Sequence, residues 1–451
     1  MKKLMLICAP FTSRSGYGDH ARDLFYSFNK SGKYDIKVID VRWGECPRDA
    51  LNPNDEKDKK ILDCILPMPP QMDRQPDIYV DIRIPNEFET FGKFNIGITA
   101  GIETTAVSNS WIEGCNKMDL IIVPSNHSKD GFVNTVYDKI QNSPDGKQQK
   151  IGEHKLEKPM EVLFEGVDEK IFKPLHVDDM SDSFLSKMNK VVSEKFAFLF
   201  VGQWSKGGFG EDRKDISKMI KVFYESFANK KKQPCLLLKT NGAGFSILEK
   251  DEILNKINSI KNLFPTDWKL PSVYLLHGDM SRDELNNLYN HPKVKAMVSF
   301  THGEGFGRPL LEASMTGLPV IASAWSGQMD FLDSKNSILV SGEIGDIPKS
   351  IVWDDIIIEQ SQWFYVNENK AYSALNYAFE NQGEIKRNGE TLMYKNREKF
   401  TLDKMADKLD EIMKKHTSDM PSQVGLKLPK LKKVGESKLP KIKLPQLEKV
   451  G

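Results

Sequence analysis

Two glutamates, Glu304 and Glu312, stand eight positions apart around a glycine-rich turn. An apolar run over residues 294–300 precedes the turn and predicts a buried strand. Pro309 follows where a helix can begin, because proline's missing N–H costs nothing in the first helical turn. A strand, a glycine turn and a helix start together direct free backbone N–H groups toward an anion. The segment therefore predicts an anion site flanked by two carboxylates.

Glu312 falls in the first turn of the expected helix, which we expect to reach about Thr316 before Gly317 and Pro319 end it. A carboxylate there is placed beside the anion and is suited to accept hydrogen bonds from two hydroxyls, such as those of a ribose. Phosphate and ribose together indicate a nucleotide. An ordinary strand-to-helix turn with two surface acids is the alternative interpretation.

These residues resemble the Glu-x7-Glu motif of the retaining nucleotide-sugar glycosyltransferases of family 4. The resemblance rests on Glu304-Gly305-Phe306-Gly307-Arg308-Pro309-Leu310-Leu311-Glu312-Ala313 and on residues 317–322. It extends more loosely over residues 1–415. It implies the GT-B fold, in which two Rossmann-like domains face a cleft, and transfer of a sugar from a nucleoside diphosphate with retention at the anomeric carbon.

The resemblance also implies roles for the residues of the motif. Glu304 would contact the donor sugar and Glu312 the ribose. The N–H groups of Gly305, Phe306 and Gly307 would assist in binding the diphosphate.

A basic pair follows the first strand of the second half of the chain. Residues 196–201 lead into an expected turn at Gly202, and Arg213 and Lys214 stand at an expected helix start. Departure of a nucleoside diphosphate concentrates negative charge, so cations there stabilise the transition state more than the ground state. We therefore predict that Arg213 and Lys214 bind the diphosphate. Relatives often carry an arginine where this chain has Gln203, and a solvated pair on a helix end is the alternative.

Three further strand ends supply candidate donor contacts. Gly16 and Gly18 form an expected Gly-x-Gly turn before a helix, which permits close approach of a phosphate or sugar. Thr240 ends the expected strand 235–240, at the depth of the donor. Met280 lies in a loop whose backbone holds the base in relatives.

Glu103 is the remaining catalytic candidate, because it lies at the C-terminal end of an expected strand. A helix cap or a loop acid is the alternative interpretation. Many relatives carry a histidine near this place, but none stands between Gly97 and Ile112, so we assign no catalytic histidine.

Apolar runs alternate with amphipathic stretches along most of the chain, which predicts an α/β fold of two doubly wound domains. Expected strands cover residues 3–9, 35–40, 77–84, 95–99, 120–123, 161–164, 196–201, 235–240, 273–277, 294–300 and 319–322. Expected helices cover residues 19–30, 110–117, 127–137, 214–229, 246–262, 282–290 and 308–316. A polar stretch over residues 174–194 is the expected linker.

Four segments follow from this division. We predict an acceptor-side Rossmann-like domain over residues 1–180 and a nucleotide-sugar-binding domain over residues 190–395. A helix over residues 396–416 would cross back to the first domain, with Thr401 as its cap. Residues 417–451 form a lysine- and proline-rich tail in which 426–435 recurs as 442–451, so we expect it to be disordered. A linear docking motif for a protein or an anionic surface is the alternative function of the tail.

Charge and cysteine content argue against nucleic-acid binding and against a zinc site. The formal net charge of +1 does not favour nucleic-acid binding. Five scattered cysteines without Cys-x2-Cys spacing favour free thiols, a reducing compartment and a cytoplasmic location, and do not favour a zinc site. Because protein cations would neutralise the diphosphate, we expect no cofactor and no obligatory metal.

The predicted partners are a nucleotide sugar and an unidentified glycan, lipid or protein acceptor. Two other functions remain open at this point: a sugar-nucleotide epimerase of the same fold, and a non-catalytic sugar-nucleotide-binding protein. An epimerase would convert the donor without an acceptor, and a binding protein would not hydrolyse it.

Overall fold

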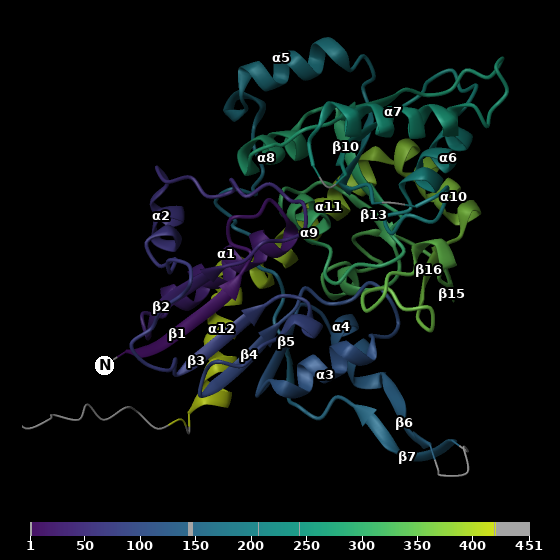
Figure 1. Cartoon of the computed structure of the whole chain (residues 1–451). Helices are drawn as coiled ribbons and strands as arrows, with labels where there is room; N and C mark the ends of the chain where they lie inside the picture. Colours follow the sequence, from purple (N-terminus) through teal and green to yellow (C-terminus); the bar gives the residue numbers. More distant parts are fainter. Residues whose placement is uncertain (1, 143–147, 206, 243, 419, 421–451) are drawn as a thin grey trace, which may run out of the picture.

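The computed structural model describes residues 2–142, 148–205, 207–242, 244–418 and 420. These residues form two α/β domains, each built on a six-stranded parallel sheet (Figure 1). The predicted fold class of two doubly wound Rossmann-like domains is thereby confirmed. The repeats predicted in the tail lie outside the described residues.

The first domain has the strand order β2-β1-β3-β4-β5-β8. Its strands are β1 (Lys3–Ala9), β2 (Tyr34–Asp40), β3 (Ile78–Ile82), β4 (Phe94–Ile98), β5 (Leu120–Val123) and β8 (Met160–Val162). Its helices are α1 (Gly16–Lys30), α2 (Glu56–Leu62), α3 (Asn109–Lys117) and α4 (Asn126–Asn134). Met5 and Ile7 pack with α1 on one side of the sheet, while Leu6 and Cys8 pack with Tyr79 on the other. Burial on both sides explains why the strands read as continuous apolar runs.

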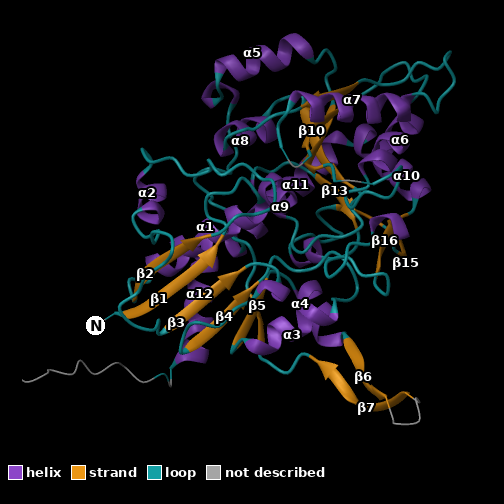
Figure 2. Cartoon of the chain, viewed as in Figure 1, coloured by secondary structure: helices purple, strands orange, loops and turns teal. Residues whose placement is uncertain are grey.

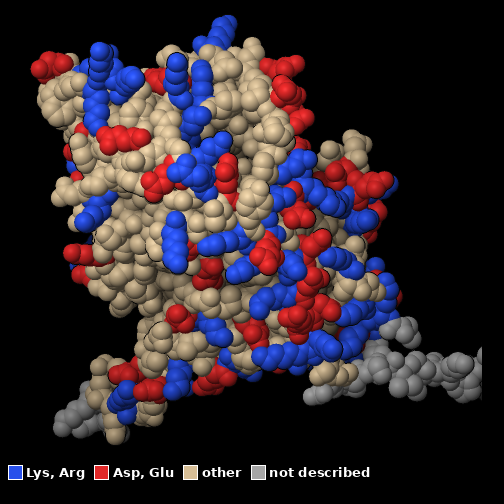
Figure 3. Space-filling view, turned by 180° about the vertical axis from the view of Figure 1, so that it is seen from behind, with Lys and Arg blue, Asp and Glu red and all other residues tan. Residues whose placement is uncertain are grey.

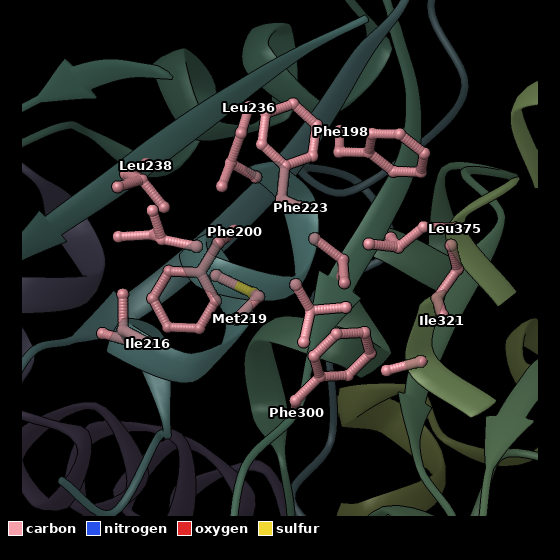
Figure 4. Packing of buried hydrophobic residues seen from close by; sticks show 14 of the residues in the cluster. Phe198, Phe200, Ile216, Met219, Phe223, Leu236, Leu238, Phe300, Ile321 and Leu375 are labelled. Carbon is pink, nitrogen blue, oxygen red and sulfur yellow. The ribbon is translucent and has the colours of Figure 1, made fainter. Parts of the chain in front are cut away.

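The second domain has the strand order β11-β10-β9-β12-β13-β14. Its strands are β9 (Ala197–Gln203), β10 (Cys235–Asn241), β11 (Val273–Leu276), β12 (Val294–Ser299), β13 (Val320–Ser323) and β14 (Ile338–Val340). Its helices are α6 (Ile216–Phe227), α7 (Ile247–Lys261), α8 (Arg282–Asn290), α9 (Arg308–Met315), α10 (Glu368–Glu380) and α11 (Gln382–Lys399). Figure 4 shows Phe198 and Phe200 of β9 packed against Met219 and Phe223 of α6.

The strand order of the second domain reverses between β9 and β12. Helices that follow these two strands pack on opposite faces of the sheet, so the loops leaving the strands diverge and open a crevice. The loop after β9 carries Arg213 and Lys214, and the loop after β12 carries the glycine turn. The topology thus brings together two segments that are about ninety residues apart in the sequence.

The last helix, α12 (Leu402–Thr417), leaves the second domain and lies beside α1 in the first (Figure 1). Thr401 caps it as predicted, because its side chain accepts a hydrogen bond from the N–H of Lys404. Lys30 pairs with Asp403 at 2.8 Å and Lys33 with Asp410. Figure 3 shows basic and acidic side chains interspersed over the lower right of this back face.

Two predicted segments differ in secondary structure from the expectation, each for a local reason. The expected linker contains a helix, α5 (Asp182–Val191), because Phe184 and Met188 lie four apart and pack on the core of the second domain. The expected helix 127–137 ends at Asn134, and β6 (Val136–Asn142) and β7 (Gln148–Lys155) follow as an antiparallel hairpin (Figure 2). Most of β7 is exposed, so no apolar run marks it in the sequence.

The remaining small elements border the second domain or the connections. They are the antiparallel pair β15 (Gly342–Asp346) and β16 (Gln362–Val366) and the 3-10 turns η1 (Pro85–Glu87), η2 (Val177–Asp179), η3 (Gly327–Asp330) and η4 (Lys349–Ile351). Across the described part of the chain, every helix is too short or too polar to cross a membrane.

Candidate active site

A cleft of about 2060 Å³ lies between the two domains. Ten of the twelve predicted site residues line it: Glu304, Lys214, Arg213, Glu103, Gly16, Met280, Gly305, Phe306, Gly307 and Glu312. Gly18 and Thr240 do not line it, and both are buried. The structure therefore gathers residues from five separate segments of the chain into one space.

Gly16 and Gly18 belong to α1 rather than to a turn that precedes it, because Ser15 already caps the helix through the N–H of Gly18. A Cβ on Gly18 would lie 2.3 Å from the carbonyl oxygen of Ser13, whereas a Cβ on Gly16 would have no atom within 4 Å. Gly18 thus serves the packing of its own loop. Gly16 leaves open space in the cleft wall.

Lys214 and Glu304 form a buried ion pair at the crevice between β9 and β12. Burial lowers the pKa of the Lys214 ammonium, against the attraction of Glu304. Burial raises the pKa of Glu304, but the charges of Lys214 and Arg213 outweigh it and hold that pKa below its ordinary value. The lowered pKa keeps Glu304 a carboxylate at neutral pH.

Arg213 and Lys214 lie in a loop before α6, although the sequence analysis predicted that a helix begins at this pair. Strand β9 runs through Gly202 to Gln203, and α6 begins only at Ile216, after Asp215 in a left-handed conformation with φ of 49°. The carbonyl oxygen of Arg213 accepts hydrogen bonds from His302 N at 3.0 Å and from Thr301 Oγ1 at 3.2 Å. These bonds tie the loop of the basic pair to the glycine turn.

Arg213 reaches across the cleft and pairs with Glu103 of the first domain. Neither spacing nor composition links these two residues, which are 110 positions apart. The pairing gives Glu103 a direct role in placing the guanidinium at the site.

The glycine turn contacts the backbone of the first domain. A Cβ on Gly303 would lie 2.0 Å from the carbonyl oxygen of Glu103, and one on Gly305 would lie 2.1 Å from that of Ala100. The carbonyl oxygen of Gly305 accepts a hydrogen bond from Ser125 Oγ at 2.6 Å. The two glycines therefore allow the domains to meet at this point.

The N–H groups of the same turn remain available for a ligand. Among the described residues, those of Gly305, Phe306 and Gly307 donate to no protein acceptor, and all three residues line the cleft. Gly307 has a φ of 96° and precedes the first residue of α9, so the turn presents its donors at a helix N-terminus.

Glu312 lies one turn into α9, since the helix begins at Arg308, and not in the first turn as predicted. Arg308 Nε donates to Glu312 Oε1 at 2.9 Å, and its Nη1 lies 2.7 Å from Asp23 Oδ2 on α1. Arg282 at the start of α8 pairs with Asp19 at 3.1 Å. Sequence reasoning missed Arg308, although it stands inside the motif.

Lys239 is a further cation that the sequence analysis passed over. It lies in the buried stretch of β10, one residue before Thr240, and its Nζ donates to the carbonyl oxygen of Gly278 at 2.7 Å. Burial lowers the pKa of its ammonium. Thr240 itself does not line the cleft, and its buried hydroxyl lacks a hydrogen-bond partner among the described residues.

The opposite wall of the cleft carries an aromatic pair. The rings of Tyr17 and Trp43 lie 4.2 Å apart at 31° to one another, and both line the cleft. Thr99 and the N–H of Ala100 hold the Tyr17 hydroxyl at 2.9 and 3.1 Å. Burial raises the pKa of this phenol, so it stays neutral.

Part of the chain matches one protein-family model, and the whole fold is similar to known structures. Residues 213–351 match the family described as glycosyl transferases group 1. A sucrose-phosphate synthase from Thermosynechococcus elongatus has 12% identity and a TM-score of 0.61, covering 92% of this chain and 100% of that one. A glycosyltransferase from Rickettsia africae ESF-5 has 15% identity and a TM-score of 0.60, covering 93% and 99%.

A third structure, that of Anabaena HepE in complex with UDP-glucose, has 13% identity and a TM-score of 0.56, covering 92% and 100%. A search of curated protein sequences found no match. The structural likeness shows the GT-B fold, and together with the family match it supports a glycosyltransferase enzyme. The predicted resemblance to glycosyltransferases of GT-B fold is confirmed. Membership of family 4 stays a prediction.

Proposed function

We propose that this protein transfers a sugar from a nucleoside-diphosphate sugar to an acceptor, with retention at the anomeric carbon. The observation that carries the proposal is the buried Lys214–Glu304 ion pair, which faces the glycine turn where the sheet order reverses. A nucleotide sugar fits this arrangement, and the similar HepE structure holds UDP-glucose.

The donor diphosphate lies between the cations of Arg213 and Lys214 and the N–H groups of Gly305 to Gly307. Negative charge grows on the leaving phosphate as its bond to the anomeric carbon breaks. The cations and N–H groups of the protein are already fixed in place, so they stabilise this charge without reorganisation. The acceptor oxygen bonds the same face of the anomeric carbon, and its proton passes to the departing phosphate.

Glu304 contacts the donor sugar and Glu312 the ribose in this proposal. Glu304 accepts hydrogen bonds as a carboxylate, because Lys214 keeps it charged. The acceptor lies against the first-domain wall, which Tyr17 and Trp43 contribute. Five unpaired cysteines support a cytoplasmic location for the reaction.

A screen of nucleotide sugars by thermal shift tests the proposal first. Anything that binds only the folded chain raises its melting temperature. The donor found in this way is then incubated with and without candidate acceptors. Donor hydrolysis or transfer supports the proposal, whereas conversion of the donor into another nucleotide sugar without an acceptor assigns an epimerase.

Glu312→Gln is expected to raise the donor KM about 10-fold and to change kcat little, because it weakens a charged hydrogen bond that is made equally before and during the reaction. Steady-state kinetics with varied donor measure this. Glu390→Gln, on the surface helix α11, is the control. An unchanged KM with a collapsed kcat would instead place Glu312 in the chemistry.

Chelation by EDTA is expected to leave the rate largely intact, because Arg213, Lys214 and Lys239 place cations along the cleft. Across the described ranges, no cluster of three or more His, Cys, Asp or Glu residues could hold a metal ion. The measurement compares the initial rate with EDTA, and then after addition of Mn²⁺ or Mg²⁺. Loss with EDTA and recovery with metal would contradict this part of the proposal.

A further inference from the structure

Arg308 occupies a position between the two domains. It is the first residue of α9, and its guanidinium contacts Glu312 on the same helix and Asp23 on α1 of the first domain. The side chains of Arg308, Glu312 and Asp23 are only 11%, 8% and 2% exposed. Such burial makes the three charges interdependent, because removing one leaves the others without compensation.

The surroundings of Glu312 leave it dependent on this contact. The carboxylates of Asp19, Asp23 and Glu165 lie in the same cluster. Arg282 and Arg22 are its further cations, and both pair with Asp19. The buried Tyr289 also neighbours Glu312. Burial raises the pKa of Glu312, and the nearest opposing influence is Arg308, which both attracts the carboxylate and donates to it.

The geometry also leaves room for a ligand on the same carboxylate. Arg308 Nε takes up one acceptor position of Glu312 Oε1 at 2.9 Å, and an ionised carboxylate has about four such positions. The remaining positions can accept from two hydroxyls. A protonated Glu312 would lose acceptor capacity and would present a donor to hydroxyls that must themselves donate.

We propose that Arg308 is a positioning residue for ribose recognition, which holds Glu312 as an oriented carboxylate ready to accept from the donor's two ribose hydroxyls. This inference rests on the proposed function, since it presupposes a nucleoside-diphosphate ligand at Glu312. It adds to the motif a residue that acts through Glu312 and need not touch the ligand.

Calorimetric titration with UDP, GDP and ADP tests the inference, each compared with its 2′,3′-dideoxy counterpart. For the nucleotide that binds best, the wild-type protein is expected to prefer the ribo form by about 10- to 100-fold, as for hydrogen bonds to a charged group. Arg308→Gln is expected to reduce this preference to about 3-fold or less. The preference is a ratio measured on one preparation, so partial misfolding does not change it.

The pH dependence separates positioning from a merely structural role. In Arg308→Gln, burial acts on Glu312 with less opposition, so its pKa rises and the carboxyl is more protonated near neutrality. The loss of ribo preference in this variant relative to the wild type is therefore expected to shrink as the pH rises from about 6 to about 9. Effects on the diphosphate cancel because both nucleotides carry it.

Two further variants complete the design. Arg308→Lys keeps the charge, so it is expected to retain at least half of the ribo preference on a logarithmic scale. This variant still tests the inference if Arg308→Gln does not fold. Arg83→Gln is the matched control, because Arg83 also pairs with a buried carboxylate, that of Asp81, but does not line the cleft. Its ribo preference is expected to equal that of the wild type.

The outcomes distinguish the inference from the proposed function. A wild-type preference that persists unchanged in Arg308→Gln at every pH overturns the role of Arg308 and leaves the proposed function standing. A wild-type protein that binds ribo and dideoxy forms equally, or binds none of the three nucleotides, overturns the role of Glu312 and the inference with it.

Discussion

Replacing Lys214 with alanine is expected to lower kcat several hundred-fold or more. Loss of one preorganised group that stabilises developing charge costs about 3–4 kcal/mol in the transition state. Lys214 is held at the cleft by Glu304, and it is among the few cations placed where the diphosphate would leave. The experiment is steady-state kinetics at saturating donor, so that an effect on affinity does not mask the effect on turnover.

The control for this variant is Lys221→Ala. Lys221 lies on the following helix, α6, where it pairs with Glu225 and Glu368 at 3.0 and 2.7 Å and does not line the cleft. The Lys221→Ala substitution removes the same charge at a position that does not contact the donor. A Lys214→Ala enzyme within about threefold of the wild-type kcat would refute the diphosphate role, because it would correspond to less than about 1 kcal/mol.

Replacing Gly305 with alanine is expected to lower kcat/KM about 100-fold. The added Cβ would lie 2.1 Å from the carbonyl oxygen of Ala100 and 3.4 Å from the Cα of Gly101. Both atoms belong to the backbone of the first domain, so no side chain can turn aside. Overpacking of this kind costs about 1–3 kcal/mol, and its upper end corresponds to the expected loss.

The choice of alanine makes this test specific to the contact between domains. Alanine keeps the N–H of residue 305, so a lost anion donor cannot explain a lower rate. Gly383→Ala on α11 is the control, because its nearest neighbour is the flexible end of Arg387 at 3.6 Å. A Gly305→Ala enzyme with wild-type kinetics would mean that the working protein does not need the domains to meet at this turn.

Local patterns in the chain were sufficient for the order and type of most large elements. Strands buried on both sides are continuous apolar runs, and the last helix shows its cap, Thr401. The same reasoning failed where an element is not defined by burial. The hairpin of β6 and β7 is largely exposed, and its stability comes from pairing between strands, which leaves little trace in the sequence.

The site shows the same division between local and non-local information. The motif from Glu304 to Glu312 was recognisable because strand, turn and helix follow one another directly in the chain. It did not reveal that Gly303 and Gly305 leave room for the other domain, since that depends on the positions of Ala100 and Glu103. Arg308 was visible within the motif, but its role depends on Asp23 of α1.

By itself, the sequence determined the two-domain α/β fold and the order of strand, glycine turn and helix around Glu304, because each depends on neighbouring residues or on hydrophobic periodicity. The assignment of this turn and its nearby cations to a nucleotide stays a prediction. Only the tertiary structure decided which charges meet. Lys214 pairs with Glu304 and Arg213 with Glu103 through the order of strands and the closure of two domains. An ion pair acts over a few ångströms in space, whereas a sequence records only the distance along the chain.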